Sequence, residues 1–335
     1  MQELDIAEMA LPGPLATAYD EAVAASTEID HFCSCTHWVL PAHAAFHADH
    51  TAFVAPLDAG FMALSRGQTS GLGRFYAALE AMWGLACPLV GERQDALGAE
   101  AALALAAQRD RWDVLWLGGI VRDGALFQAL VRGLTRTAQL RLGPVTTRHQ
   151  ASLEGGFEGW LGRRSALFRK RIRQTLRGLE RAHIELEWVD TRAVSHGLGG
   201  ADGVALFQRI HAIEQRSWKG MEGTGFVQGD MLAFYARMVP RLAQAGRLRV
   251  LFARSGGEDI AFCFGGIFGA TFRGLQNSFD DRFRELSLGN AMQAHTIARL
   301  ADEGVALYDL GSEMEYKARW AEGGLQTVTL IAVNR

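Results

Sequence analysis

The order of elements in the second half of this 335-residue chain is the feature that most constrains its fold. Three strand-like segments follow one another there, and a helix and a further apolar strand come after them. The segments are RLRVLFAR (247–254), DIAFCFGGIFGA (259–270), TFRGLQNSFD (271–280), a helix from Gly289 to about Asp302, and VALYDLG (305–311). Strands joined by such short connections form an antiparallel meander. Helices, a meander, and then another helix and strand predict a mixed α+β fold.

The first half repeats this mixture of sheet and helix. Its predicted elements are a hairpin of 51–57 with 60–67, helices over 95–110 and 125–134, and a buried strand over 112–120. The second half adds helices over 157–183, 203–218 and 230–246, and strands over 184–190 and 325–333. Two halves of similar order indicate a duplicated fold with its boundary near 145–156. We therefore expect two domains, 1–150 and 151–335.

The composition is that of an ordinary globular protein, with 49% hydrophobic and 21% charged residues. A formal net charge of -3 argues against broad nucleic-acid binding, which would need a local basic patch. The first residues lack the basic and apolar regions of a signal peptide, and the longest apolar run, 260–272, is too short to span a bilayer. The four cysteines are too scattered for a disulfide framework. We expect a cytoplasmic protein without a membrane span.

Lysine is rare in this chain, and each lysine lies in a motif-like stretch. Lysine and arginine total 34, of which only Lys170, Lys219 and Lys317 are lysines. A lysine kept in an arginine-biased chain indicates a place for a compact, strongly hydrated cation that a guanidinium cannot replace. Chance placement is the alternative.

Four spaced motifs carry a resemblance to a known family. They are SALFRKRIRQTLRGLERA, RSWKG, NSFDDRFRELSLGN and YDLGSEMEYKARW, and they cover roughly 155–322. Together they resemble the CelD/BioF2-like acetyltransferase group of the GNAT superfamily, which is related to the Fem peptidyltransferases. The resemblance implies two tandem GNAT-like domains, each a mixed, mostly antiparallel sheet flanked by helices. It also implies acyl transfer to a nucleophile, usually an amine.

In the resembling family, the acyl-CoA pyrophosphate binds a glycine-containing turn at a helix N-terminus, with the pattern Q/R-x-x-G-x-G/A. Gly289 and Ala291 fit this pattern, whereas Leu286 replaces its polar first residue. Ser287, Gly289 and Asn290 would present backbone N–H groups to a phosphate. The same residues also make an ordinary helix cap.

Lys317 and Tyr316 are the first candidates for catalysis. Acyl transfer requires positive or dipolar groups around the developing oxyanion, and Lys317 could supply the charge. The resemblance implies that the lysine of such an aromatic–lysine pair lies in the active site. Tyr316 could bind the substrate or donate a proton to the leaving group. A packed C-terminal turn with solvated charges is the alternative.

A general base and an acceptor site are the remaining requirements. The candidate bases are Glu214, Asp280, Asp281, Asp309 and Glu313, of which Asp280 ends a core strand and Glu214 precedes the Trp–Lys pair. Caps and surface ion pairs explain most such carboxylates, and ordered water could act instead. Trp218, Lys219 and Trp320 are expected to shape the acceptor site.

Basic residues repeat along the long helix predicted over 157–183. Arg169, Arg173, Arg177 and Arg181 share one face. This face is either solvated or a dock for an anionic carrier, namely CoA phosphates, an acyl carrier protein or tRNA.

Residues 31–50 are rich in histidine and cysteine. Their Cys-x-Cys-x-His spacing is not a standard structural-zinc pattern, so we expect no metal.

These patterns predict an acyltransferase that moves an acyl group from acyl-CoA, or from an acyl-carrier thioester, to an amine. The acceptor would be a small molecule, a peptide or a sugar, and acyl-CoA would be the co-substrate. An acyl carrier protein is a possible partner, and tRNA is less favoured because the chain is mildly acidic. The alternatives are a Fem-like transferase that uses aminoacyl-tRNA and a GNAT-fold protein that binds ligands without turnover.

Overall fold

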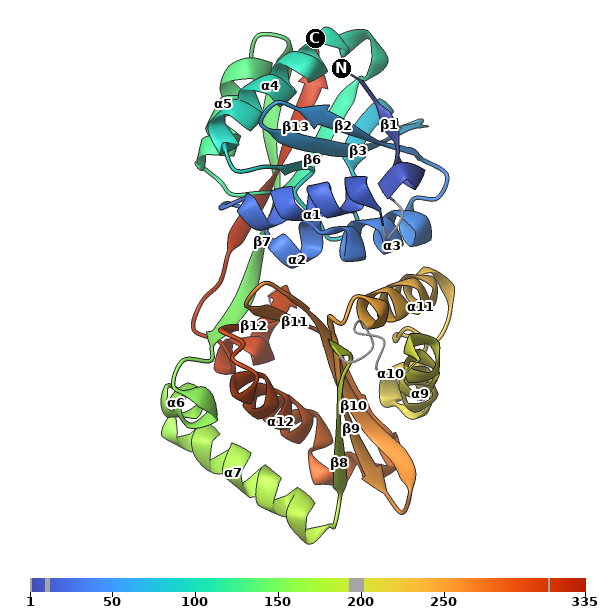
Figure 1. Cartoon of the computed structure of the whole chain (residues 1–335), viewed down its shortest axis with the longest axis vertical. Helices are drawn as coiled ribbons and strands as arrows, with labels where there is room; N and C mark the ends of the chain where they lie inside the picture. Colours follow the sequence, from blue (N-terminus) through green and yellow to red (C-terminus); the bar gives the residue numbers. More distant parts are fainter. Residues whose placement is uncertain (1, 10–12, 193–201, 313) are drawn as a thin grey trace. The chain divides into compact units, whose positions relative to one another are not determined.

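The chain forms two compact units of mixed sheet and helix (Figure 1). The structure is a computed structural model that describes residues 2–9, 13–192, 202–312 and 314–335. One unit comprises Met1–Thr147 and Leu325–Arg335, and the other comprises Arg148–Gly324. The predicted α+β fold with two sheet-and-helix domains is confirmed.

The first unit contains a sheet in the order β1-β2-β3-β4-β6-β13-β7, and β5 pairs with β3. The predicted hairpin is present, because β2 and β3 pair antiparallel. The strands are β1 Leu4–Asp5, β2 Thr51–Leu57, β3 Gly60–Thr69, β4 Gly73–Ala78, β5 Leu89–Val90, β6 Val114–Ile120, β7 Ala138–Ser152 and β13 Gln326–Asn334. The helices are α1 Pro14–Ala25, α2 His31–Ser34, α3 Thr36–Phe46, α4 Gln94–Ala107 and α5 Ala125–Leu134.

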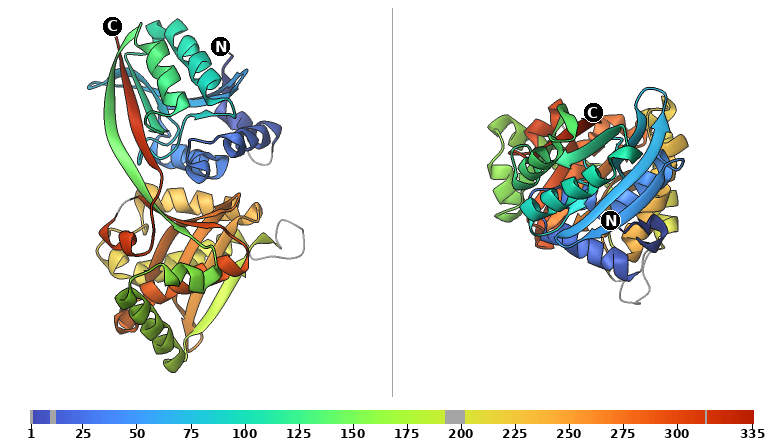
Figure 2. Two further views of the ribbon diagram at one scale, coloured as in Figure 1. Left: turned by 90° about the vertical axis from the view of Figure 1, so that its left-hand side faces the viewer. Right: turned by 90° about the horizontal axis from the view of Figure 1, so that it is seen from above.

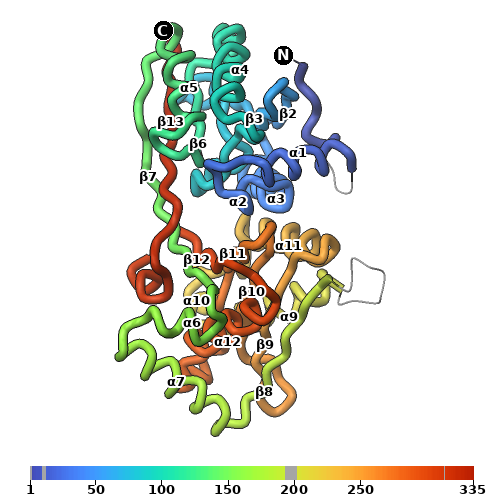
Figure 3. The backbone as a smooth tube through the Cα atoms, turned by 60° about the vertical axis from the view of Figure 1, so that its left-hand side comes forward, coloured from blue at the N-terminus to red at the C-terminus, as the bar shows by residue number. Residues whose placement is uncertain are grey.

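The last strand of the chain completes the sheet of the first unit. β13 pairs antiparallel with both β6 and β7, and β7 and β13 run side by side (Figure 2, Figure 3). The domain predicted over 151–335 is therefore wrong at its C-terminal end, where 325–335 belongs to the first unit. An apolar strand buries its side chains equally well in either of two sheets, so its sequence did not indicate which one it joins.

The predicted boundary near 145–156 is largely a strand. Residues 138–147 of β7 pair with β13, and residues 148–152 pair with β12 of the second unit. Many side chains of this strand are polar and half-buried, so the sequence AQLRLGPVTTRHQAS shows little of the apolar alternation that predicts a strand.

The second unit contains a sheet that ends in the order β7-β12-β11-β10-β9-β8. Helices α7 and α12 cover one face, and α9 and α11 cover the other (Figure 1). The strands are β8 Glu185–Asp190, β9 Leu248–Ser255, β10 Glu258–Phe268, β11 Thr271–Phe279 and β12 Leu307–Ser312. The helices are α6 Gly156–Gly162, α7 Ala166–Arg181, α9 Gly203–Arg216, α10 Trp218–Met221, α11 Gly229–Gln244 and α12 Leu288–Asp302.

Two neighbouring parallel strands of the second unit separate partway along their length. β11 and β12 pair only from Thr271↔Leu307 to Arg273↔Asp309. Beyond this rung β11 continues to pair with β10, while β12 continues to pair with β7. Arg273 Nη1 lies 2.9 Å from Asp309 Oδ2, and the Gly311 N–H donates to Asp309 Oδ1 at 2.7 Å. A buried ion pair thus closes the last rung before the strands separate.

The histidine- and cysteine-rich segment forms α2 and α3 and packs into the first unit. Cys33 and Cys35 are buried, and the rings of His47 and His50 stack at 5.1 Å. Within the described ranges, no three His, Cys, Asp or Glu side chains gather as metal ligands. Across the same ranges, no helix has both the length and the apolar character that crossing a membrane would require.

The position of β13 predicts which part of the protein depends on it. Leu330 is 1% exposed and lies opposite Leu117 and Leu142 in the ladder. We expect Leu330→Ala to cost about 2–5 kcal/mol of unfolding free energy because it leaves a cavity in the first unit. Hydrogen exchange should show faster exchange in 114–120 and little change in 248–279. Gln326→Ala, at an exposed position of the same strand, is the control. Loss of protection confined to 248–279 would contradict this assignment.

Candidate active site

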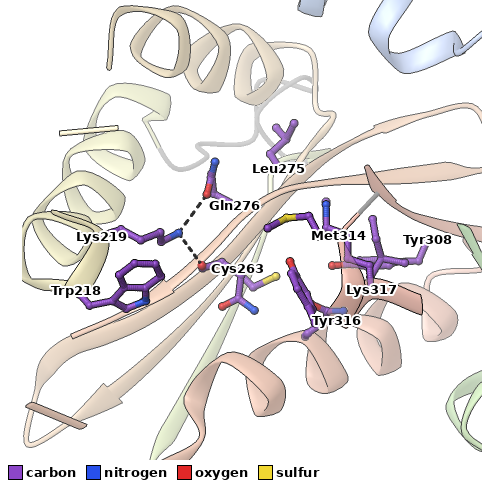
Figure 4. Close-up of a pocket in the computed structure, with 13 residues that line it drawn as sticks. Trp218, Lys219, Cys263, Leu275, Gln276, Tyr308, Met314, Tyr316 and Lys317 are labelled. Atoms are coloured by element: carbon purple, nitrogen blue, oxygen red, sulfur yellow. Dashed lines mark hydrogen bonds between the residues drawn. The ribbon is translucent and has the colours of Figure 1, made fainter. Parts of the chain in front are cut away.

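A pocket of about 400 Å³ lies where β11 and β12 separate. One wall is Gly274, Leu275, Gln276 and Asn277, the part of β11 beyond the last shared rung. Figure 4 shows Trp218 and Lys219 on one side of this space and Met314, Tyr316 and Lys317 on the other. We call this the central pocket. Because sheet pairing has ended here, the backbone leaves room for a ligand between the two strands.

Lys317 lines the central pocket, and its pKa is lowered there. The short 3-10 turn Glu315–Arg319 follows β12 and carries Tyr316 and Lys317. Lys317 Nζ donates to the Ser312 carbonyl at 2.9 Å. Burial, and next the nearby Arg273, lower the pKa of Lys317 to about 8, against an opposing effect of Asp309. Lys317 therefore changes charge within the range of pH in which enzymes work.

Tyr316 is the aromatic partner of Lys317. Its ring centroid lies 6.0 Å from Lys317 Nζ, and the residue is 49% exposed. Burial of the hydroxyl raises the pKa of Tyr316, so the phenol stays protonated at neutral pH. A protonated phenol is a hydrogen-bond donor and a proton source.

Lys219 is held in place by several partners. Its Nζ donates to Gln276 Oε1 at 3.3 Å and to the Asn277 carbonyl at 3.2 Å (Figure 4). Glu214 Oε1 lies 3.9 Å from the same nitrogen. Burial lowers the pKa of Lys219, and Glu214 opposes that change.

Glu214, a predicted base, is fully buried and does not line the central pocket. The structure places it next to Lys219, where it balances the charge of that lysine.

Asp280 is held by two arginines away from the central pocket. Arg216 Nε donates to it at 2.6 Å and Arg282 Nη2 at 2.8 Å. Burial raises the pKa of Asp280, but the hydrogen bonds from Arg282 and Arg216 outweigh it and lower the pKa to about 2. A carboxylate with this pKa is a poor proton acceptor, so the geometry does not support its predicted role as a base.

The other candidate carboxylates are similarly engaged or lie elsewhere. Asp309 is paired with Arg273, and Asp281 is paired with Arg284. Glu313 lies outside the described residues. The lining of the central pocket contains lysines but no aspartate or glutamate among the described residues.

The predicted phosphate-binding turn lies at the start of α12. Ser287 adopts the left-handed conformation with φ +52°, and its carbonyl accepts from the N–H groups of Asn290 and Ala291. The Asn290 and Ala291 N–H groups are thus used within the turn, so in the described structure the N–H groups of Leu288 and Gly289 are the ones available to an anion. A second pocket of about 330 Å³ faces this turn and is lined by Asn277, Phe279, Ser287, Gly289, Asn290, Gln293, Tyr316 and Trp320. We call it the turn pocket.

Trp320 lies apart from the other two predicted acceptor residues. It is 3% exposed, stacks on Trp160 at 5.5 Å, and meets Phe168 edge-on at 5.1 Å. It lines the turn pocket, whereas Trp218 and Lys219 line the central pocket. The structure thus separates the predicted set into an aromatic cluster beside α12 and a Trp–Lys pair beside β11.

Three arginines of the predicted basic face of α7 have partners, whereas Arg171, which is not on that face, lies at a pocket. Arg173 pairs with Glu158 at 2.9 Å, and Arg169 and Arg181 donate to backbone carbonyls. Arg171 instead lines a third pocket of about 440 Å³, together with Arg319, Asn290, Tyr316 and Trp320. Basic charge therefore lies next to the turn that opens α12.

Sequence reasoning missed Asn277 and Gln293. Asn277 Nδ2 donates to the Gly289 carbonyl at 2.8 Å, which fastens the start of α12 to β11. Gln293 follows Gly289 by four residues on α12, so both lie on one helix face. Two adjacent amides, Gln276 and Asn277, within a predicted strand were the available signal for the first residue.

The second unit, in which the parallel strands β11 and β12 separate, contains the part of the chain that matches a known family. Residues 166–318 match the family described as acetyltransferase (GNAT) domain. The predicted resemblance is thereby confirmed. A search of curated proteins finds no match to the chain.

Solved structures share the fold over nearly the whole chain. FemX is 12% identical with a TM-score of 0.62, covering 98% of this chain and 97% of that one. L-PGS from Bacillus licheniformis is 11% identical with a TM-score of 0.55, covering 97% and 92%. The C-terminal domain of a putative lysylphosphatidylglycerol synthetase from Agrobacterium fabrum is 14% identical with a TM-score of 0.52, covering 94% and 92%. At these identities the likeness shows the fold alone, and it extends over both units of the chain.

The two arginines around Asp280 make its role testable. Because its folded pKa lies below that of the unfolded chain, ionised Asp280 stabilises the fold above about pH 4. That contribution disappears as the pH falls through about 2. We expect Asp280→Asn to lower the unfolding free energy at pH 7 by about 2–3 kcal/mol. Denaturant titrations should show this difference vanishing between about pH 4 and 2.

Asp281→Asn is the matched control, since its carboxylate pairs with an exposed arginine and should contribute less than about 1 kcal/mol. A large loss of turnover in Asp280→Asn without loss of stability would instead indicate a general base.

Proposed function

We propose that the protein transfers an acyl group from acyl-CoA, or from an acyl-carrier thioester, to an amine of a small molecule, peptide or sugar. The observation that carries this proposal is that the central pocket and the turn pocket share three lining residues: Asn277, Gln293 and Tyr316. A donor bound at the turn and an acceptor bound beside Lys317 would therefore meet at one place. Such a meeting point is the first requirement of direct transfer.

The donor would bind along the start of α12. Its pyrophosphate would lie at the N–H groups of Leu288 and Gly289 in the 287–290 turn, and the basic groups of Arg171 and Arg319 would attract its remaining phosphates. The thioester arm would then pass Tyr316, which lines all three pockets.

The acceptor would enter the central pocket between Trp218–Lys219 and Lys317. Its nitrogen attacks the thioester carbonyl, the N–C bond forms, and the C–S bond breaks. Protonated Lys317 stabilises the negative charge that develops on the carbonyl oxygen. Tyr316 gives its proton to the departing thiolate and regains one from the nitrogen. This path needs no carboxylate base, in keeping with the linings of the two pockets.

Donor binding provides the first test of this proposal. Gly289 has room for a methyl group, because an added Cβ would meet only the Phe279 ring, at 3.6 Å. We expect acetyl-CoA or a long-chain acyl-CoA to bind saturably in calorimetry, and Gly289→Ala to keep that binding. Gly289→Glu should weaken it at least tenfold, because a carboxylate would face the phosphates.

Failure of both thioesters to bind would overturn the proposal that acyl-CoA is the donor. Tight binding of a peptide or metabolite in that case would favour a non-catalytic binder.

The pH dependence of turnover tests Lys317. If its protonated form stabilises the oxyanion, kcat/KM should fall as the pH rises through about 8. Lys317→Arg should move that fall to higher pH, since guanidinium stays charged. Lys317→Met should reduce kcat by about 10²–10³-fold and leave donor affinity within a few-fold. Initial rates with the best acceptor from an amine panel supply the measurement. An unchanged alkaline limb in Lys317→Arg would exclude this role.

A Fem-like transferase that uses aminoacyl-tRNA is the second candidate. The exposed basic groups of α7 beside the third pocket favour it, as does the fold shared with FemX. A tRNA complex whose affinity falls steeply with salt, and falls further in Arg171→Ala, would select this candidate.

A further inference from the structure

The meeting point of the two pockets is formed by few side chains. Asn277, Gln293 and Tyr316 line both pockets, and two of the three are amides. An amide side chain cannot act as a base at ordinary pH, but it offers both hydrogen-bond donors and acceptors at fixed positions. Only those donor and acceptor atoms that have no partner within the protein are therefore available to a ligand.

One atom of each amide has no hydrogen-bond partner in the described part of the chain. They are Gln293 Nε2 and Asn277 Oδ1, and both atoms are buried. Gln293 as a whole is only 7% exposed. Buried polar atoms in folded proteins are nearly always paired, and an unpaired one costs stability. Two unpaired atoms at the wall that both pockets share therefore point to a ligand that pairs them.

The orientation of Asn277 is set by its neighbour. Its Nδ2 donates to the Gly289 carbonyl at 2.8 Å, and a carbonyl accepts only from the nitrogen side of an amide. The free atom is thus the oxygen, an acceptor. Gln293, four residues after Gly289 on the same helix face, contributes the free donor.

We infer that Gln293 Nε2 donates to the thioester carbonyl oxygen and that Asn277 Oδ1 accepts from an N–H of the attacking amine. This inference rests on the proposed acyl transfer and assigns its two positioning contacts. When the N–C bond forms, the carbonyl oxygen becomes negative and its bond from Gln293 strengthens. The C–S bond then breaks, and the nitrogen's proton reaches the thiolate through Tyr316. Asn277 orients the amine and takes no proton.

Binding of two donors tests Gln293 without knowledge of the acceptor. Acetyl-CoA has the carbonyl oxygen, and its S-ethyl thioether analogue lacks it. We expect wild-type protein to bind acetyl-CoA roughly two- to tenfold more tightly in calorimetry, and Gln293→Met to abolish that preference. Equal affinities in the wild type would overturn the role of Gln293 while the CoA site stands. Failure of both ligands to bind would overturn the proposed function and this inference with it.

Stability separates this role from a structural one. Gln293→Met has a similar shape and removes an unpaired buried donor, so its thermal unfolding temperature should equal or exceed that of the wild type. A clearly lower temperature would show that the amide supports the fold, and would overturn the inference.

Turnover gives a further signature. Gln293→Met should lower kcat about 10²–10³-fold. Gln293→Glu should be slower still at neutral pH and recover as the pH falls, because only the protonated acid donates to the oxyanion. An absence of that recovery would count against the assignment.

For Asn277, the expected result in Asn277→Leu is a rise in the KM for the amine that clearly exceeds the loss of acetyl-CoA affinity caused by removing its bond to Gly289. A parallel loss of donor affinity would show that its bond to Gly289 is its main function, and would overturn its assigned contact with the amine.

Discussion

The ion pair between Arg273 and Asp309 marks the point on which the second unit depends. It fixes the last rung that β11 and β12 share, and the two strands follow different neighbours beyond it. The residues of β11 and β12 that line the central pocket are next to that rung or lie beyond it. Both members of the pair also affect the pKa of the nearby Lys317: Arg273 lowers it and Asp309 raises it. A single buried interaction therefore sets both the opening in the sheet and the electrostatics inside it.

The positions of the three lysines give a physical reason for the rarity of lysine in this chain. Two of the three lysines line the central pocket, and the third is exposed on α7. Both pocket lysines are buried enough that their pKa values are lowered. An ammonium group can lose its charge in such a place, whereas a guanidinium keeps it. Arginine, by contrast, serves here mainly in fixed pairs, as in Arg216 with Asp280 and Arg273 with Asp309.

The sequence predicted most of the elements but not the details that tertiary packing decides. The meander, α12 and the pairing of Tyr316 with Lys317 follow from local pattern and motif, and the structure places Lys317 at the pocket. The polar strand β7 and the destination of β13 depend on partners far along the chain. The sequence alone made Asp280 a candidate base, because it does not show the two arginines that hold its carboxylate. Trp320 lies in an aromatic cluster that its own segment does not predict. The roles of these residues, and the cytoplasmic location, stay predictions.

The insertion of the second unit between the strands of the first has a consequence for biosynthesis. During translation the chain emerges from its N-terminus, and domains generally fold as units as they appear. The first unit lacks the strand between β6 and β7 until residues 326–334 have emerged. The second unit, encoded by 148–324, has all its residues available earlier. The nascent chain can therefore complete the later-encoded domain first, and the edges of β6 and β7 that β13 joins stay unpaired until residues 326–334 have emerged.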